Sequence, residues 1–339
     1  MNPIRPVLEE LSREIGDLTE RRGHRVEVVD MGVTDREGQL ALDPPGGRIS
    51  CNRSCRLLQA TDGWLVLNLA RPEDRELLPA WLAADVGADV WAEVEGQVAG
   101  RPCAELVERG ALVGLPVGRV GEVVSETLEA PMLQMGSPVP RRGRDLRVVD
   151  LSALWAGPLC GAILSSLGAS VSKVESPERP DPTRDATPAF DRRLNGRKRL
   201  VSCDLRSPEG RAQLRGLVRE ADVLITGARP RAFAGLDLRP EDVFADNPGL
   251  VWVAITGYGW SGDGAARVAF GDDAAAAGGL VSWEADGPRF LGDALADPIT
   301  GLAAAVGALK ALETGGGCLV DVALARMAAG AAWRMGLAA

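Results

Sequence analysis

One acidic residue, Asp297, stands where its carboxylate could do chemistry. It lies in the sequence Ala-Asp-Pro-Ile-Thr-Gly (296–301), and an Asp-Pro pair commonly starts a helix, with aspartate as N-cap and proline as the first helical residue. Backbone N–H groups and the helix dipole would keep such a carboxylate ionised. An ionised carboxylate can act as a nucleophile. The residues alone favour the capping role, and the two roles are compatible.

Two further segments could bind an anionic ligand. Residues 154–158 (Leu-Trp-Ala-Gly-Pro) follow a predicted strand and begin a predicted helix, where Gly157 allows close approach of the backbone and the helix N-terminus attracts phosphate. Many α/β proteins have such a turn without a ligand. The densest group of basic residues comprises Arg192, Arg193, Arg197, Lys198 and Arg199. A solvated basic loop would have the same composition.

Alternating strands and helices must position these residues. Short β-branched segments predict strands at 147–151, 170–174, 200–204, 222–225, 250–255 and 318–322. Apolar spacing and composition predict helices at 158–167, 208–219, 240–246, 274–280 and 298–312. This alternation favours an α/β fold with a Rossmann-like, largely parallel sheet covered by helices on both faces.

The first part of the chain has a different pattern. It predicts a helix near 8–18, strands at 26–29 and 64–69, a helix at 71–82, and a helix, glycine turn and extended piece over 101–123. Residues 131–143 are rich in Pro, Gly and Arg and predict a linker. We therefore expect a smaller α+β portion over residues 1–140 and a Rossmann-like domain over 141–339.

Composition argues against several classes of function. The net charge is -9 and Lys and Arg form no long run, so nucleic acid and anionic membranes are not expected as partners. No stretch is apolar enough for a membrane span or a signal peptide. The 6 cysteines form no C-x-x-C pair and there is 1 histidine, so no metal site is expected. We expect a soluble cytoplasmic protein with reduced thiols.

Four phrases of the second portion carry a family resemblance. They lie at 147–175, 197–225, 247–264 and 292–324. In this order and spacing they resemble the class III CoA-transferases, the CaiB/BaiF family, which includes formyl-CoA transferase, carnitine CoA-transferase and 2-methylacyl-CoA racemase. Two earlier segments, at 54–82 and 106–123, resemble the part that follows the sheet domain in the family. The chain therefore resembles a permuted or rearranged member.

The resemblance implies roles for the acids. In the transferases, the aspartate of the D-x-x-[ST]-G phrase attacks the acyl-CoA thioester, and Asp297 matches that aspartate. Family transferases often have a second acid at the position of Gly271, and a shift of one residue in the alignment would bring Asp272 into the site. Asp272 and Asp273 before an alanine run are equally typical of a helix N-terminus.

The resemblance also implies a binding site for coenzyme A. Leu154, Trp155, Ala156 and Gly157 match the family loop that lies against CoA, and Trp155 could stack on adenine or fill the core. The family's R-x-K-R phrase, beside the CoA phosphates, corresponds to the segment with Arg197 and Lys198. Other family residues are replaced, as at Gly227-Ala228, where the neighbouring Arg229 could substitute together with Arg231.

Glycine amides are expected to stabilise the oxyanion of the reaction. The candidates are Gly278 and Gly279, or the Gly46-Gly47 pair, which occupies the place of a mobile glycine loop in the family. For Gly46 and Gly47, an ordinary surface turn is the alternative interpretation.

These features together predict an enzyme that transfers CoA from an acyl-CoA to a carboxylic acid through an aspartyl-CoA intermediate, without a metal. We expect a homodimer, or pairing with a related subunit, because the chain lacks material that closes each family subunit. One alternative is a catalytically silent acyl-CoA-binding homologue or partner subunit, and a second is a racemase of the family. An unrelated nucleotide-binding enzyme is disfavoured, because the G-x-G-x-x-G and P-loop motifs are absent.

The racemase alternative leads to a first prediction. Phe270 stands where a racemase would place its histidine, and removal of the 2-proton of an acyl-CoA needs a positioned base. We predict that the protein catalyses no deuterium exchange at C2 of 2-methylacyl-CoA thioesters in D2O, as measured by NMR. Enzyme-dependent exchange that disappears in Asp297→Asn would show that another base has replaced the histidine.

Overall fold

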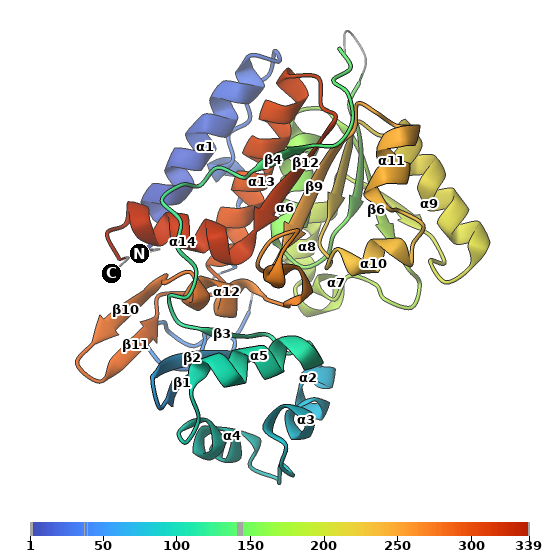
Figure 1. Ribbon diagram of the computed structural model, residues 1–339. Coiled ribbons are helices and arrows are strands. Elements are labelled where there is room, and N and C mark those ends of the chain that lie inside the picture. Colours follow the sequence, from blue (N-terminus) through green and yellow to red (C-terminus); the bar gives the residue numbers. More distant parts are fainter. Residues whose placement is uncertain (1–2, 37, 39, 141–144, 338–339) are drawn as a thin grey trace.

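A seven-stranded sheet dominates the computed structural model, which describes residues 3–36, 38, 40–140 and 145–337 (Figure 1). The strand order is β4-β12-β9-β8-β5-β6-β7. Neighbouring strands run parallel except for β4, which pairs antiparallel with β12. The strands are β4 (Met132–Gln134), β5 (Arg147–Leu151), β6 (Ser170–Glu175), β7 (Arg199–Ser202), β8 (Val223–Thr226), β9 (Val251–Thr256) and β12 (Cys318–Ala323).

The central strands form because their residues are apolar on both faces. Every residue of β8, β9 and β12 is buried, as expected for parallel strands that are covered by helices on each side. The chain first builds outward from β5 through β6 to β7, and then returns to place β8 on the other side of β5. In open α/β sheets, a crevice forms at the carboxyl ends of the strands where the order reverses in this way.

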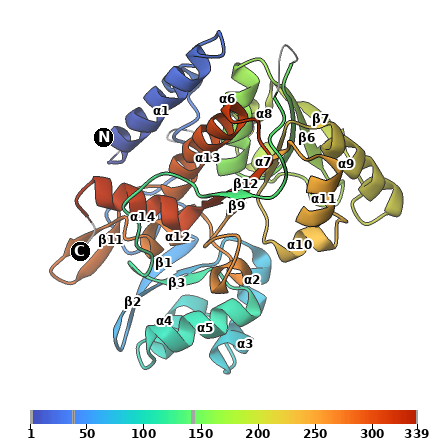
Figure 2. The same ribbon diagram turned by 45° about the horizontal axis from the view of Figure 1, so that its top comes forward.

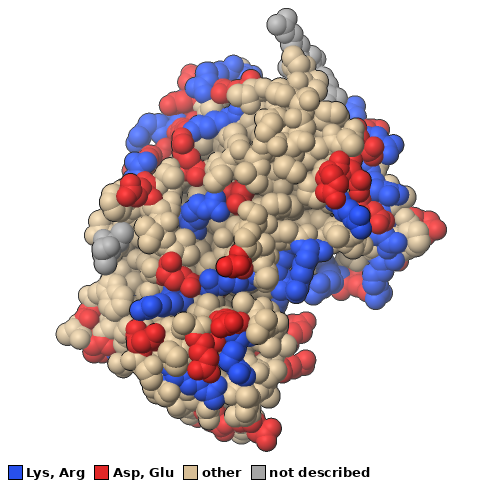
Figure 3. Space-filling view, in the orientation of Figure 1, with Lys and Arg blue, Asp and Glu red and all other residues tan. Residues whose placement is uncertain are grey.

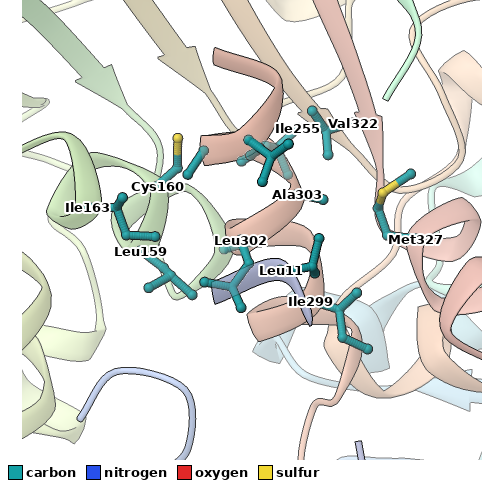
Figure 4. Packing of buried hydrophobic residues seen from close by; sticks show 14 of the residues in the cluster. Leu11, Leu159, Cys160, Ile163, Ile255, Ile299, Leu302, Ala303, Val322 and Met327 are labelled. Atoms are coloured by element: carbon teal, nitrogen blue, oxygen red, sulfur yellow. The ribbon is translucent and has the colours of Figure 1, made fainter. Parts of the chain in front are cut away.

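Helices cover both faces of the sheet (Figure 2). One face carries α6 (Ala156–Ser166), α13 (Ala296–Glu313) and α1 (Arg5–Glu20), and the other carries α9 (Pro208–Glu220), α10 (Arg231–Ala234) and α11 (Pro240–Asp246). Most of α13 is buried, because it lies in the same core as α1, α6 and the sheet (Figure 4). The predicted α/β fold with helices on both faces is confirmed.

A smaller part lies below the carboxyl edge of the sheet in Figure 1. It has an antiparallel sheet of β1 (Cys55–Ala60), β2 (Gly63–Asn68) and β3 (Val117–Arg119), with its own apolar core. Its helices are α2 (Pro72–Glu76), α3 (Leu78–Leu82), α4 (Val90–Val98) and α5 (Cys103–Val113). Helix α12 (Gly271–Ala277) connects the two parts, because it packs against β2 and β3 on one side and α14 (Leu324–Arg334) on the other.

The remaining elements are short. They are α7 (Thr183–Ala186), α8 (Pro188–Asn195), the hairpin of β10 (Val281–Glu284) and β11 (Gly287–Phe290), and two 3-10 turns, Val29–Met31 and Asp263–Ala266. None of the helices in the described ranges is long and apolar enough to cross a membrane.

Two local predictions were wrong. Residues 26–29 form no strand, and Val29 instead begins a 3-10 turn. Part of the predicted linker 131–143 forms β4, because an exposed segment can still form hydrogen bonds to the free edge of β12. Residues 141–143 of that linker lie outside the described residues. Since α1 packs on α13 and β4 joins the large sheet, both halves predicted from the sequence contribute to the α/β body.

The packing of α13 against α6 requires a glycine. A Cβ atom at Gly301 would lie 2.7 Å from the Ala156 carbonyl oxygen and 2.7 Å from Leu159 Cδ2. Real side chains do not approach so closely, so only glycine lets the two helices pack at this distance. Gly301 is the glycine of the D-x-x-T-G phrase, and its packing places the start of α13 beside the start of α6.

We therefore predict that Gly301→Ala lowers the free energy of unfolding by about 1–3 kcal/mol, because the added methyl group overpacks the α6–α13 contact. Gly216→Ala is the matched control. It lies inside the exposed helix α9 with no atom near a Cβ, and it should raise stability by up to about 1 kcal/mol. Urea unfolding of the three proteins measures both effects, and equal stability of Gly301→Ala and wild type would contradict the prediction.

Candidate active site

A cleft of about 700 Å³ opens at the carboxyl edge of the sheet. Its wall includes residues that directly follow β5, β8, β9 and β12, so it lies at the point where the strand order reverses between β5 and β8. Lining residues come from both parts of the molecule. They include Arg71, Ser152, Leu154, Ala156, Gly157, Arg179, Arg229, Arg231, Thr256, Arg267, Phe270 and Asp297.

Asp297 lies in the first turn of α13 and is half-buried in the cleft wall. The expectation that it caps the helix was wrong. Leu295 is the N-cap, and the Asp297 amide already donates to the carbonyl of Ala294 at 2.9 Å. The helix begins earlier than predicted because Ala294 takes a left-handed turn (φ 46°) whose amide donates to the buried carboxylate of Asp272. The Asp297 carboxylate is therefore directed to the cleft without a capping bond.

Burial raises the pKa of Asp297 to about 7. The nearby guanidinium of Arg36 lowers the pKa, whereas the carboxylates of Asp272, Asp293 and Asp273 raise it further. The sequence predicted an acid that is held ionised by the helix N-terminus. Burial and neighbouring negative charge outweigh the helix here, so the carboxyl exchanges its proton near neutral pH.

Asp272 is placed beneath the cleft and is almost fully buried. Its carboxylate accepts hydrogen bonds from Asn52 Nδ2 and the Ala294 amide, both at 2.8 Å. Burial raises the pKa of Asp272 to about 6. These contacts tie the start of α12 to the turn before α13. The structure thus places Asp272 behind Asp297, where it acts on the site through its charge and through the Ala294 turn.

Asp273 has the same kind of position on the other side of α12. It is fully buried, and it accepts hydrogen bonds from Asn68 Nδ2 at 2.8 Å and from the Phe270 amide at 3.0 Å. Burial raises the pKa of Asp273 to about 7. Asn68 ends β2, so this contact joins the smaller sheet to the helix below the cleft.

Gly271 leaves no room for the second acid that the family often has at this position. A Cβ atom there would lie 2.4 Å from Asp297 Oδ2. A side chain at residue 271 would therefore displace the Asp297 carboxylate. Phe270, at the place of a racemase histidine, lines the same cleft, and the guanidinium of Arg71 lies 5.5 Å above its ring.

The 154–157 loop borders the cleft, as predicted. The side chain of Trp155, however, is not part of the cleft wall. Leu154, Ala156 and Gly157 line the cleft. Trp155 is 2% exposed, donates its indole N–H to the Val33 carbonyl at 2.9 Å and packs edge-on against Phe190. Of the two interpretations of this residue, the structure supports the core-filling one, because the segment before residue 36 supplies the partner for its N–H group.

Arg197 and Lys198, which were predicted to lie beside the phosphates, do not line this cleft. Lys198 Nζ lies under α6, where it donates to Asp150 Oδ2 and the Pro158 carbonyl, both at 2.8 Å. Its side chain is fully buried. Arg197 borders two other surface hollows, away from Asp297. Burial against α6 thus removes Lys198 from the site.

Five arginines line the cleft instead, of which Arg71 and Arg267 pair with Asp74 and Glu122. Arg229 and Arg231 were expected there, whereas Arg71, Arg179 and Arg267 were not. The five arginines come from four separate segments, so no local run of basic residues could identify them together in the sequence. Figure 3 shows Lys and Arg side chains gathered on this face where the α/β body meets the smaller part. In a chain of net charge -9, this local concentration favours an anionic ligand.

Three of the four predicted oxyanion glycines use their amides elsewhere. Gly278 donates to the Ala274 carbonyl and Gly279 to the Ala276 carbonyl, which closes the end of α12. The Gly46 amide donates to the Phe290 carbonyl, and the Gly47 carbonyl accepts from the Phe290 amide. None of these four glycines lines the cleft. The cleft wall therefore includes none of these positions, and at Gly46, Gly278 and Gly279 the amide is already bonded to a carbonyl.

One carboxyl with a pKa near neutrality faces a cleft that is lined by arginines and by a strand-to-helix loop. Such a cleft suits an anionic ligand that reacts at the carboxyl. In the part of the chain that the structure describes, no group of three or more His, Cys, Asp or Glu side chains is arranged to hold a metal ion.

The structure is that of an α/β protein with a cleft at the strand-order reversal. A sequence model described as CoA-transferase family III matches residues 144–336, and the chain belongs to this family. The succinyl-CoA–D-citramalate CoA-transferase of Chloroflexus aurantiacus is 34% identical over 203 residues, which are 55% of this chain and 50% of that protein. The formyl-CoA:oxalate CoA-transferase of Escherichia coli is 31% identical over 195 residues, 53% of this chain and 46% of that protein.

A solved structure gives the same family. A CaiB/BaiF family protein from Brucella suis superposes with a TM-score of 0.52 at 35% identity and covers 55% of this chain and 54% of its own. The chain thus spans about half the length of the curated relatives it matches.

The raised pKa of Asp297 predicts a pH-dependent effect of Asp297→Asn on stability. The pKa of the carboxyl rises from 3.8 to about 7 on folding, so the unfolded chain binds fewer protons between these values and wild type loses stability as the pH rises through them. Asp297→Asn should therefore match wild type near pH 4 and exceed it at pH 8 by about 1–3 kcal/mol. Urea unfolding at both pH values measures this difference.

Asp62→Asn is a control of opposite sign. The Cys103 amide donates to Asp62 and lowers the pKa of that carboxyl, so its ionised form stabilises the fold. Asp62→Asn should lose stability at pH 8 and approach wild type at acid pH. If Asp297→Asn behaved like Asp62→Asn, the pKa assigned to Asp297 would be wrong.

Proposed function

We propose that this chain transfers CoA from an acyl-CoA thioester to a carboxylic acid, with Asp297 as the nucleophile. The observation that carries the proposal is the position of Asp297 in the arginine-lined cleft beside the 154–157 loop. The loop ends at the N-terminus of α6, which attracts phosphate, and the arginines suit the phosphates of CoA and the carboxylate of an acceptor.

The proposed reaction has four bond exchanges. The ionised Asp297 attacks the thioester carbonyl, which breaks the C–S bond and gives an acyl-aspartyl anhydride and CoA thiolate. The thiolate then attacks the aspartyl carbonyl and releases the donor acid, leaving an aspartyl-CoA thioester. The acceptor carboxylate attacks this thioester and again forms an anhydride and the thiolate. Attack of the thiolate on the acceptor carbonyl yields the new acyl-CoA and free Asp297.

The pKa of Asp297 sets the pH at which the proposed nucleophile is available. Because the attacking form is the carboxylate, the active fraction grows as the pH rises through about 7. A bound anion would change the pKa of Asp297. Each added negative charge raises that pKa, and each guanidinium that faces the carboxyl lowers it. The raised pKa also means that the carboxylate is less well solvated than a surface aspartate, which favours its reaction with a bound carbonyl.

Relatives support this class of reaction and leave the substrates open. The relatives from Chloroflexus aurantiacus and Escherichia coli are named as CoA-transferases that use succinyl-CoA and formyl-CoA. We propose that the acceptor is a small carboxylic acid, by analogy with the acids in the names of these relatives.

The second candidate function is an acyl-CoA-binding subunit that requires a partner. Two observations favour it: the chain spans about half the length of its relatives, and these include proteins named as the alpha and beta subunits of a succinyl-CoA–L-malate CoA-transferase. The expected oxyanion amides are also missing from the cleft, and a second polypeptide could supply them.

Trapping the aspartyl intermediate tests the proposed function. Wild-type protein incubated with succinyl-CoA and then with hydroxylamine should carry a hydroxamate at Asp297, located by peptide mass spectrometry. Asp297→Asn should show no adduct and lose transfer by at least about 10³-fold, because the covalent route is closed.

Asp272→Asn is the matched control, because Asp272 is buried beneath the same site and outside the cleft wall. It should still form the adduct at Asp297. An adduct at another residue would refute the assignment of Asp297. CoA binding by wild type without any adduct, across a panel of acyl-CoA donors, would favour the second candidate.

A further inference from the structure

The loop that borders the cleft contains a residue with an unfavourable backbone conformation. Leu154 has φ 69°, in the left-handed region where a side chain with a Cβ atom is disfavoured. It is neither glycine nor asparagine, the residues that commonly tolerate this region. Surrounding groups must therefore hold it there.

Two buried charged residues bond to the two ends of the short segment 152–154. Lys173 Nζ donates to the Ser152 carbonyl at 2.6 Å, and the Leu154 amide donates to both carboxylate oxygens of Asp181 at 3.2 Å. Lys173 and Asp181 also bond to each other at 2.8 Å. Each residue thus contacts the other and one end of the same segment.

This ion pair is almost completely buried, with side-chain exposures of 2% for Lys173 and 0% for Asp181. Removing two charges from water is costly, and a buried pair often adds little net stability compared with apolar residues of the same size. Asp181 also accepts bonds from the amide and hydroxyl of Thr183, so its remaining acceptor positions are used. The arrangement is fully bonded, which suits a role in fixing geometry.

The segment determines where the cleft wall lies. Ser152 and Leu154 line the cleft themselves, and the chain turns at Leu154 into α6, where Ala156 and Gly157 continue the wall. The backbone at Gly157 packs directly against Ser152, since a Cβ atom at residue 157 would lie 2.2 Å from Ser152 Cβ. A change in the Leu154 backbone would therefore move the start of α6 relative to Asp297.

We propose that Lys173 and Asp181 are positioning residues that hold Leu154 in its left-handed conformation and thereby set the affinity of the cleft for CoA. This inference rests on the proposed function for the identity of the ligand. The conformational part depends only on the contacts of the ligand-free protein.

The decisive experiment combines a variant of the pair with a variant of the strained residue. Asp181→Asn weakens the support of Leu154, and CoA affinity measured by isothermal titration should fall by about tenfold or more, the size expected for lost bonds to a charged group. Leu154→Gly in the Asp181→Asn background should recover most of that loss, because glycine adopts φ 69° without strain. Failure of Leu154→Gly to recover any affinity would count against the proposal.

Ala83→Gly is the matched control for the second substitution. Ala83 also has a left-handed backbone (φ 53°), but it ends α3 in the smaller part and does not line the cleft. It should leave the CoA affinity of Asp181→Asn unchanged. Recovery by Ala83→Gly as well as Leu154→Gly would mean that general stabilisation is sufficient, and would overturn the proposal.

A readout without ligand separates this inference from the proposed function. Amide hydrogen exchange over residues 152–157 should accelerate in Asp181→Asn by about tenfold or more. Such acceleration supports the positioning role even if wild type binds no CoA, a result that would refute only the function. Unchanged exchange and unchanged CoA affinity in folded Asp181→Asn overturns the positioning role.

Thr183→Val is the alternative variant if Asp181→Asn does not fold. It removes the hydroxyl that donates to Asp181 at 2.7 Å and leaves the ion pair intact. In Thr183→Val we again expect faster amide exchange and weaker CoA binding, but both changes should be smaller. Leu154→Gly should again recover the affinity. The absence of any change would count against the proposal.

Discussion

The contact between α13 and α6 is the constraint on which the site depends. Gly301 allows the two helices to approach until the carbonyl of Ala156 lies against the backbone of α13. Both helices begin at the carboxyl edge of the sheet, so their close packing brings Asp297, in the first turn of one, to the cleft that the first turn of the other borders. A larger residue at this crossing would separate the acid from the loop, whatever the residues at the site.

Electrostatics in the cleft follow from burial more than from local sequence. Asp297, Asp272 and Asp273 each have a raised pKa because the packing of α12 and α13 removes water from them. Five arginines line the cleft, and two of them, Arg71 and Arg267, pair with Asp74 and Glu122. The protein thus places acids that hold protons near neutral pH below a surface that attracts anions. This combination suits the proposed transfer, in which one carboxylate must react while negative substrates remain bound.

Two buried ion pairs support the same loop from different sides. Lys198 and Asp150 lie under α6, and Lys173 and Asp181 lie beside the segment that leads into it. The family resemblance implied a phosphate contact for Lys198, whereas Lys173 was given no role. The structure instead gives them internal partners. The charged groups of these lysines hold the cleft wall in place. Arginines from distant segments give the cleft its positive electrostatic potential.

The sequence by itself determined the strands and helices of the α/β body, since periodic apolar residues and β-branched runs are local signals. It also identified Asp297, the 154–157 loop and Arg229, which the structure brings to one cleft. Only the tertiary structure decided that Trp155 and Lys198 turn inward, that Asp297 does not cap its helix, and that the amides of Gly278, Gly279 and Gly46 are already bonded. Only the tertiary structure likewise placed Arg71, Arg179 and Arg267 in the cleft wall. The physical reason is that burial, helix start and bond partner depend on segments far apart in the chain, and these meet only when the sheet, α12 and α13 pack together.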